Sequence, residues 1–311
     1  MSDMDIKNEV LRRILAGPFG WNLKKQNLLE CDVNEAETQT DEQALTVENK
    51  ELSKRAAQRL VASEINKQKN MEDVIQRADK LLQKGTKIKS TSEESDQAWV
   101  EDFLDGAGKA YDDELKDYWA KLLAGKIKNP GKYSKRITNF MKTISQKDAE
   151  RIKKICPYVM YDLKGDALIL RYDNEKASYE DISFLAELQL LDSSSFVVKA
   201  FKFNKGKGNV ILLKKYIGYL LTIERREYDL PIYAFTQLGK EVLTIVDDAE
   251  VDIGYLKDFS LSITKGKTDL VAKCGNLKID DDGLMLKDGL IFEVPKQETT
   301  ETAINTEIDN K

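Results

Sequence analysis

The sequence of 311 residues lacks histidine altogether. This absence excludes Ser-His-Asp and Cys-His catalysis, the usual zinc centres and the commonest general base near neutral pH. Carboxylate–magnesium chemistry and lysine chemistry are still allowed. The chain also has only three cysteines, Cys31, Cys156 and Cys274, which are far apart. An odd, scattered set fits neither a disulfide framework nor the paired spacing of a zinc site, so we interpret all three as small core or surface residues.

Long hydrophobic runs are absent as well. No apolar stretch approaches the roughly 20 residues that a membrane-spanning helix requires, and the patch from Ile14 to Trp21 is interrupted by Gly17, Pro18 and Gly20. The first residues carry no basic region of the kind that begins a signal peptide. With 41% hydrophobic and 33% charged residues, the composition is that of a well-solvated globular chain. We predict a cytoplasmic protein without a membrane span.

Changes in hydrophobic period divide the chain into five parts, and its length favours about two domains. We predict an N-terminal amphipathic segment with an acidic linker (1–49), a helical domain (50–156), a winged-helix-like domain (157–250), a small α/β C-terminal extension (251–295) and a disordered tail (296–311). The tail is assigned because it lacks apolar periodicity. The predicted fold class is therefore α+β, mostly α.

A long helix is predicted from about Val47 to Leu82. Apolar residues recur in it at spacings of three and four, at Met71, Val74, Ala78 and Leu81. A narrow stripe of this kind among many charges indicates a solvated helix lying on a bundle. The alternative is a coiled-coil arm, for which the stripe covers few heptads.

Further helical stripes are predicted between residues 92 and 155, on both sides of the breaker Asn129-Pro130-Gly131. The stretch Ser145-Gln146-Lys147-Asp148 is typical of a capping box. The side chains that we expect to be buried together are Trp119, Leu122, Leu123, Phe140 and Ile144.

After Pro157 the period changes, and counted from the helix that ends before this proline the order is helix, short strand, helix, hairpin and helix, which is the order of a winged-helix-like module. The residues from Phe196 to Phe203 and from Val210 to Tyr216 alternate like the two arms of one hairpin. We therefore expect residues 204–209 to form the connection between paired strands.

Charge is strongly segregated although the net charge is only −5. Residues 92–117 hold ten acids and two bases, residues 121–154 hold eleven bases and two acids, and residues 199–226 hold eight bases and one acid. One interpretation is that the acidic segment packs against the basic helices. The other is that basic residues contact a polyanion or a partner. The candidate contact residues are Lys132, Lys135, Arg136, Lys142, Lys205 and Lys207.

Specific reading of DNA is disfavoured by the helix predicted at 178–192. This helix contains Glu180, Asp181, Glu187 and Asp192 but no arginine or lysine. A helix that reads base edges in the major groove uses Arg, Asn or Gln. Binding to a protein is the better interpretation of this module.

Acidic clusters at two places could suggest metal sites, but we interpret both clusters without a metal ion. Asp280-Asp281-Asp282-Gly283 resembles part of a calcium loop, but Lys278 and Gly289 occupy positions where an EF-hand needs acids, so we predict a turn. A second group of acids, explained by the dipole at a helix start, is Asp112, Asp113, Glu114 and Asp117. We predict no catalytic residues, no metal and no cofactor.

Three stretches resemble the bacterial domain-of-unknown-function family twenty-eight-oh-six: Arg59 to Leu82, Trp99 to Ala149 and Phe235 to Glu241. The most specific is the Trp-Ala-x-Leu-Leu-Ala-Gly-x-Ile sequence at 119–127, followed by Pro-Gly and Ser. The resemblance covers roughly residues 55–250 and supplies no catalytic residues. A similar Leu-Trp-Ala-x-Leu-Leu-Ala stretch occurs in a family linked to abortive phage infection, which implies a setting in bacterial phage defence.

These observations predict a non-catalytic interaction or regulatory protein that acts through contacts with an unidentified protein partner. The alternative is a nucleic-acid-binding module that uses the basic segments 121–154 and 199–226. The sequence does not define an oligomeric state.

Overall fold

The computed structural model describes residues 47–82, 97–129, 131–173, 176–192, 198–280 and 283–296. The predicted amphipathic segment 1–31, the linker up to residue 46, the tail from residue 297 and Cys31 lie outside these residues. The chain forms two compact units that meet in the sequence between Thr143 and Ile144. No helix in the described part is both long and apolar enough to span a bilayer.

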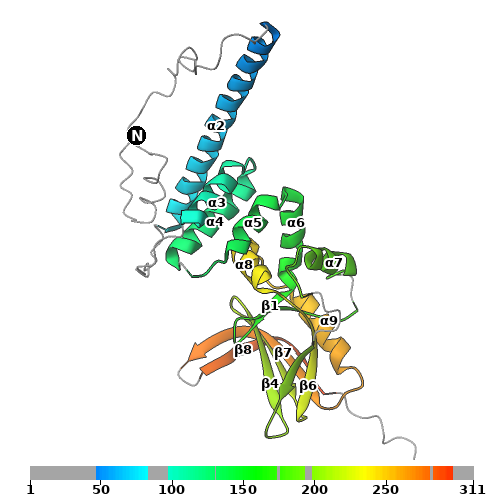
Figure 1. Ribbon diagram of the computed structural model, residues 1–311. Helices are drawn as coiled ribbons and strands as arrows, with labels where there is room; N and C mark the ends of the chain where they lie inside the picture. Colours follow the sequence, from blue (N-terminus) through cyan, green and yellow to red (C-terminus); the bar gives the residue numbers. More distant parts are fainter. Residues whose placement is uncertain are drawn as a thin grey trace, which may run out of the picture. The chain divides into compact units, whose positions relative to one another are not determined.

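The first unit is helical, as predicted (Figure 1). It contains α2 (Val47–Leu82), α3 (Gln97–Gly108), α4 (Asp113–Lys128) and α5 (Lys135–Thr143). The C-terminal half of α2 packs on α3 and α4, and α3 also packs on α5. Only this half of α2 is covered, because residues 50–62 of the same helix are exposed.

Local sequence signals begin these helices where they were predicted. The Asp112 side chain caps α4 by accepting hydrogen bonds from the backbone N–H groups of Glu114 and Leu115. In the second unit, Ser145 and Asp148 form the predicted capping box at the start of α6 (Gln146–Ile155). Each cap satisfies backbone donors that a helix start leaves without an intrahelical partner.

Close helix packing in the first unit depends on small residues. A Cβ atom added to Gly106 of α3 would lie 2.3 Å from the Trp119 ring of α4, so glycine is needed at this contact. Trp119 also makes an edge-to-face contact with Phe103, with ring centroids 5.5 Å apart. All five residues predicted for this core are buried, Ile144 among them as the first residue of the second unit.

The second unit contains four α-helices and eight strands among its described residues. After α6 and the 3₁₀-helix η2 (Cys156–Tyr158), the remaining helices are α7 (Tyr179–Glu187), α8 (Gln237–Val246) and α9 (Ile253–Thr264). The strands are β1 (Val159–Asp162), β2 (Ala167–Leu170), β3 (Val198–Lys202), β4 (Gly208–Lys214), β5 (Ile217–Ile223), β6 (Glu227–Ala234), β7 (Leu270–Asp280) and β8 (Gly283–Val294).

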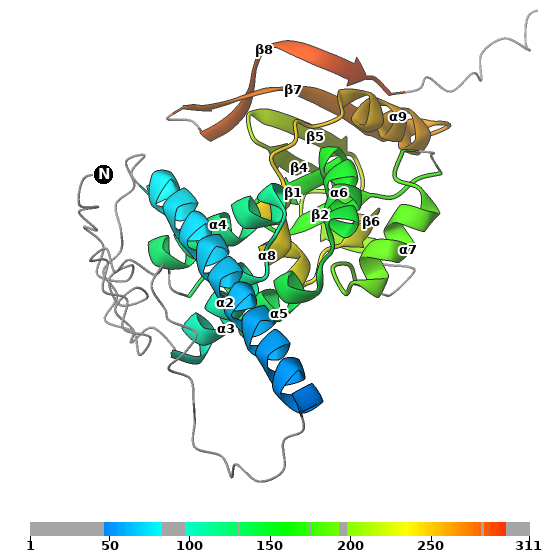
Figure 2. The same ribbon diagram turned by 90° about the horizontal axis from the view of Figure 1, so that it is seen from above.

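The strands form one antiparallel sheet in the order β3-β6-β2-β1-β4-β5-β7-β8. Figure 2 shows α9 lying beside β7. The class α+β, with a helical N-terminal part and an antiparallel sheet, is thus confirmed. A winged-helix-like module is not confirmed, since the strands of 157–250 belong to this larger sheet.

The predicted hairpin between Phe196–Phe203 and Val210–Tyr216 is wrong. β3 pairs with β6, whereas β4 pairs with β5. Alternation of apolar and polar residues defines which face of a strand is buried, but it does not define which strand it pairs with. The pattern at 196–216 therefore fits a hairpin as well as it fits the observed pairing. The region 251–295 does contain one further helix, but its two strands are 11 and 12 residues long and continue the main sheet through β5.

The packing around Trp119 yields a stability prediction. Replacing Trp119 with Ala should lower the free energy of unfolding by roughly 3–5 kcal/mol, because it removes a fully buried aromatic ring and leaves a cavity. Urea denaturation followed by circular dichroism would measure the change. The control is Tyr111→Ala, since Tyr111 is 68% exposed and its loss should change little. A loss below about 1 kcal/mol for Trp119→Ala would contradict this packing.

Candidate functional site

The four basic candidates of the first unit differ in their surroundings. Lys142 Nζ lies 2.7 Å from a carboxylate oxygen of Asp102 and 3.5 Å from one of Asp105. Burial lowers the pKa of Lys142, but the hydrogen bond to Asp102 and the charge of Asp105 outweigh it, so the pKa is raised. The residues of segment 92–117 thus neutralise Lys142, as the first interpretation of the charge pattern predicted. This lysine is a poor candidate for contact with a polyanion.

The other three candidates, Lys132, Lys135 and Arg136, are exposed at the start of α5 and just before it. The ammonium group of Lys132 lies 5.0 Å from the centre of the Tyr133 ring, within range of a cation–π contact.

Two acids of the segment 92–117, Asp113 and Asp117, have a partner that the sequence did not indicate. Arg77 of α2 donates hydrogen bonds to Asp73 at 2.9 Å, to Asp113 at 2.6 Å and to Asp117 at 2.7 Å. The bond to Asp73 is the largest cause that raises the pKa of Arg77. Asp113 and Asp117 therefore bind a cation of their own chain, which argues against the magnesium alternative at the start of α4.

The basic segment 121–154 also divides between the two units. Lys154 Nζ lies 3.2 Å from Asp181 of α7, and Arg151 lies 3.7 Å from the same residue. Burial raises the pKa of Asp181, but hydrogen bonds from Ser178 and Lys154 outweigh it and lower the pKa. The acidic residues of α7 thus pair with two of the basic residues of α6 within the second unit.

A positive surface forms at one end of the sheet in the second unit. Three connections lie together there, because Gly208 pairs with Ile223 and Ile223 pairs with Leu270. Two backbone hydrogen bonds join these connections, from Phe203 N to Arg226 O and from Glu224 N to Asp269 O. We call residues 202–208, 224–227 and 265–269 the basic sheet end.

The basic sheet end contains seven bases and three acids. Its bases are Lys202, Lys205, Lys207, Arg225, Arg226, Lys265 and Lys267. Lys205 and Lys207 were predicted contact residues and are exposed, and no acid of the described chain lies within 4 Å of either ammonium group. Arg225 and Lys267 were missed, since they lie more than 40 residues apart and only strand pairing brings them together.

The most deeply buried ion pair of the described residues joins Lys214 to Asp247. Their side chains are 3% and 5% exposed, and Nζ lies 2.8 Å from Asp247 Oδ2. Lys214 also donates to Asp247 Oδ1 at 3.0 Å and to the backbone oxygen of Cys156 at 2.5 Å. These contacts use all three donors of the ammonium group. We interpret Lys214 as structural, because no donor and no access are left for a substrate.

The two described cysteines are poor nucleophiles. Burial, followed by the charge of Asp247, raises the pKa of the Cys156 thiol to about 12. Burial alone raises the pKa of Cys274 to about 11. The thiolate is the reactive form, so both side chains are almost fully protonated at neutral pH.

Metal ligands do not cluster in the described ranges either, where no three Cys, Asp or Glu side chains lie close enough to hold an ion. Asp280 pairs with Gly283 across β7 and β8. Asp281 and Asp282, where we predict a turn, lie outside the described ranges.

Thiol labelling tests the burial of these cysteines. In a Cys31→Ser variant at pH 8, a disulfide reagent such as Ellman's should label neither Cys156 nor Cys274, because each pKa lies well above that pH and each side chain is buried. Denaturant should expose both, giving two labelled thiols per chain. Rapid labelling of the native variant would show that one of them is an accessible thiolate.

Comparison with known proteins identifies a family. The family described as "Protein of unknown function (DUF2806)" matches residues 54–260, which is about two thirds of the chain. Among curated proteins and among solved structures, none matches significantly. The matched range includes α3 and α4, the helix caps at Asp112 and Ser145, and strands β1 to β6. Because the family matches about two thirds of the chain, the chain belongs to the DUF2806 family.

Proposed function

We propose that the chain is a non-catalytic interaction protein that binds a protein partner through the N-terminal half of α2. The observation that carries this proposal is an apolar stripe that continues beyond the helices covering it. Ala56 and Leu60 lie 18 residues, or about five full turns, before Val74 and Ala78 respectively. Each pair therefore lies on the same line along the helix.

The two halves of this stripe have opposite environments. Val74 and Ala78 are completely buried against α3 and α4, whereas Leu60 is 63% exposed and Leu52 is 57% exposed. Val61 and Ile65 are exposed as well, but they lie roughly 100° and 140° round the helix from Leu60 and so outside this stripe. Large apolar side chains that gather on an exposed surface indicate a binding site.

Charge indicates what kind of partner fits this surface. Residues 50–59 contain Lys50, Lys54, Arg55 and Arg59 but only one acid, Glu51. A partner helix with an apolar stripe and acidic flanks complements this half of α2, because helix-in-groove contacts combine apolar anchors with opposite charges at the rim. The family match begins at residue 54 and thus includes most of this surface.

Three further features are part of the same proposal. The protonated cysteines and the fully bonded Lys214 support a non-catalytic role. We place the chain in the cytoplasm on the grounds of its composition. The setting in phage defence stays a prediction based on the stretch around Trp119. The proposal does not depend on a winged-helix-like module.

A charge on the apolar stripe should abolish docking. We expect Leu60→Glu to reduce capture of the partner by tagged full-length protein at least tenfold, because burying a leucine contributes about 1.5–3 kcal/mol. Quantitative mass spectrometry of proteins captured from the host lysate would measure this. Gln58→Glu is the matched control, since it adds the same charge to an exposed position on the opposite side of the helix. Equal capture by both variants would refute docking on this stripe.

The second candidate function is nucleic-acid binding, which the basic sheet end favours. If it binds a nucleic acid with six or more phosphate contacts, affinity should fall by roughly 10³ or more between 50 and 200 mM salt, since each contact releases counterions. The double variant Lys205→Glu, Lys207→Glu should then bind every sequence more weakly. The control with the same charge change is Lys147→Glu, Lys257→Glu, at exposed positions elsewhere in the unit. Fluorescence anisotropy with duplex and single-stranded DNA measures both, and salt-insensitive or absent binding would reject this candidate.

A further inference from the structure

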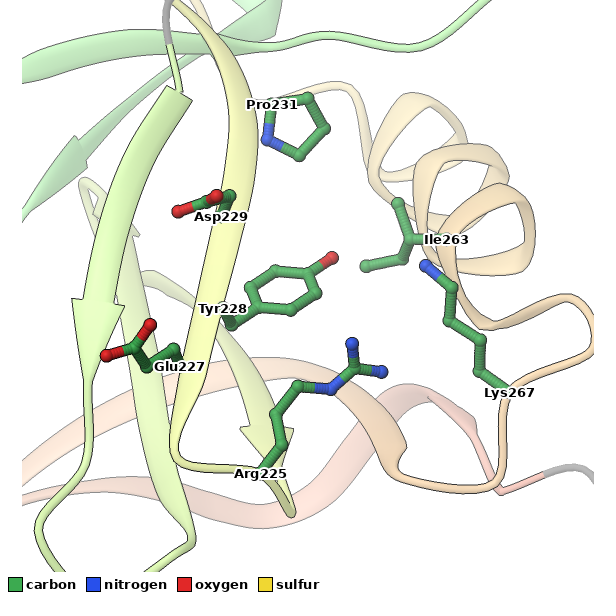
Figure 3. Close-up of a pocket in the computed structure, with 7 residues that line it drawn as sticks. All are labelled: Arg225, Glu227, Tyr228, Asp229, Pro231, Ile263 and Lys267. Atoms are coloured by element: carbon green, nitrogen blue, oxygen red, sulfur yellow. The ribbon is translucent and has the colours of Figure 1, made fainter.

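A cavity of about 410 Å³ lies at the basic sheet end, between β6 and α9 (Figure 3). Its apolar wall consists of Pro231, the ring of Tyr228 and Ile263. Its cationic side consists of Arg225, from the connection between β5 and β6, and Lys267, from the connection after α9. Charged and apolar side chains both line this cavity, so it can hold a small molecule that has a charged group and an apolar body.

Two acids, Glu227 and Asp229, also line the cavity, but neither forms an ion pair with Arg225 or Lys267 among the described residues. Side chains on a strand alternate between its faces, so Glu227, Asp229 and Pro231 lie on one side of β6 and Tyr228 on the other, and both acids are exposed whereas Tyr228 is buried. Figure 3 shows both carboxylates pointing away from Arg225 and Lys267, whereas the Tyr228 ring points toward Ile263. The side of the cavity that holds Arg225 and Lys267 is therefore positively charged.

Arg225 is held in place for binding by groups of its own chain. Its Nε donates a hydrogen bond to Asp269, whose pKa is lowered by this bond. The guanidinium carbon also lies 5.6 Å from the centre of the Tyr228 ring. Within the described residues, the two terminal nitrogens of Arg225 donate no hydrogen bond, so the two-nitrogen edge of the guanidinium is available for a ligand.

Lys267 and Tyr228 add two further donors. No acid of the described chain lies within 4 Å of the Lys267 ammonium group. Burial raises the pKa of Tyr228, so its hydroxyl stays protonated and can donate a hydrogen bond at physiological pH. In Figure 3 this hydroxyl points into the same space as Arg225 and Lys267.

We propose that this cavity binds a small phosphorylated molecule with an apolar body. The phosphate contacts Arg225, Lys267 and the Tyr228 hydroxyl, and the apolar body packs on Ile263 and Pro231. A phosphate monoester is favoured over a single carboxylate, because its several oxygens can meet the free guanidinium edge of Arg225 and the ammonium group of Lys267 together. The proposal is independent of docking by α2, which belongs to the other unit.

Phenyl phosphate is a direct probe, since it joins a phosphate to an apolar ring. We expect it to bind the full-length chain in a ligand-observed NMR titration, with inorganic phosphate competing and phenol failing to compete. Lys267→Gln should weaken binding about tenfold or more, the usual loss for a hydrogen bond to a charged group. Tyr228→Phe keeps the ring and should weaken binding severalfold.

Lys265→Gln is the matched control. It removes the same charge from the same connection, two residues away at an exposed position, and should change affinity less than about twofold. Absence of binding at millimolar phenyl phosphate would overturn the proposal, as would equal losses for Lys265→Gln and Lys267→Gln. A short single-stranded oligonucleotide that binds more tightly than phenyl phosphate, and that both lysine variants weaken equally, would also overturn it by assigning these cations to a polyanion surface.

Discussion

The buried pair of Lys214 and Asp247 is the constraint on which the second unit depends. Asp247 ends α8 and also accepts hydrogen bonds from the backbone of Ala249 and the hydroxyl of Tyr161. Lys214 ends β4 and reaches the carbonyl of Cys156 in η2. One ion pair therefore fixes the ends of a helix and a strand against β1 and the 3₁₀-helix. A buried charge that loses its partner typically costs 3–5 kcal/mol, a large fraction of the stability of a domain, so these four segments must assemble together.

The first unit is organised instead by shape. Gly106 allows the Trp119 ring to approach α3, and Gly125 makes room for Tyr133, whose hydroxyl would lie 2.5 Å from an added Cβ. The Trp-Ala-x-Leu-Leu-Ala-Gly-x-Ile sequence at 119–127 is thus explained by packing: Trp119 and Leu122 point into the core, and the small residues let other segments come close. The most specific motif of the chain describes a helix contact and contains no chemistry.

Features encoded over a few residues could be predicted from the sequence. The caps at Asp112 and Ser145 and the buried stripe around Trp119 depend on neighbours within one or two turns. Pairings across the chain could not be predicted, because periodicity does not define a distant partner. For this reason β3 was assigned to β4 instead of β6.

The same reason explains the outcome for the candidate site. Lys205 and Lys207 stand out because they are close in sequence, and they are exposed as predicted. Arg225 follows β5 and Lys267 precedes β7, so they become neighbours only through the pairing of β5 with β7. Arg77 likewise meets Asp113 from 36 residues away.

Because only the C-terminal half of α2 is covered by other helices, the free energy of local unfolding differs between the two halves of this helix. Around Val74 its hydrogen bonds can open only when the packing on α3 and α4 is lost, so opening there costs nearly the whole free energy of unfolding. Around Ala56 only helix propensity holds the backbone, and an uncovered helix of about 12–15 residues is marginal in water. Amide exchange should therefore slow by orders of magnitude from one end of the helix to the other. Any ligand that covers Leu52 and Leu60 would then stabilise the helical form of these turns. Its measured affinity would include the free energy needed to keep them folded.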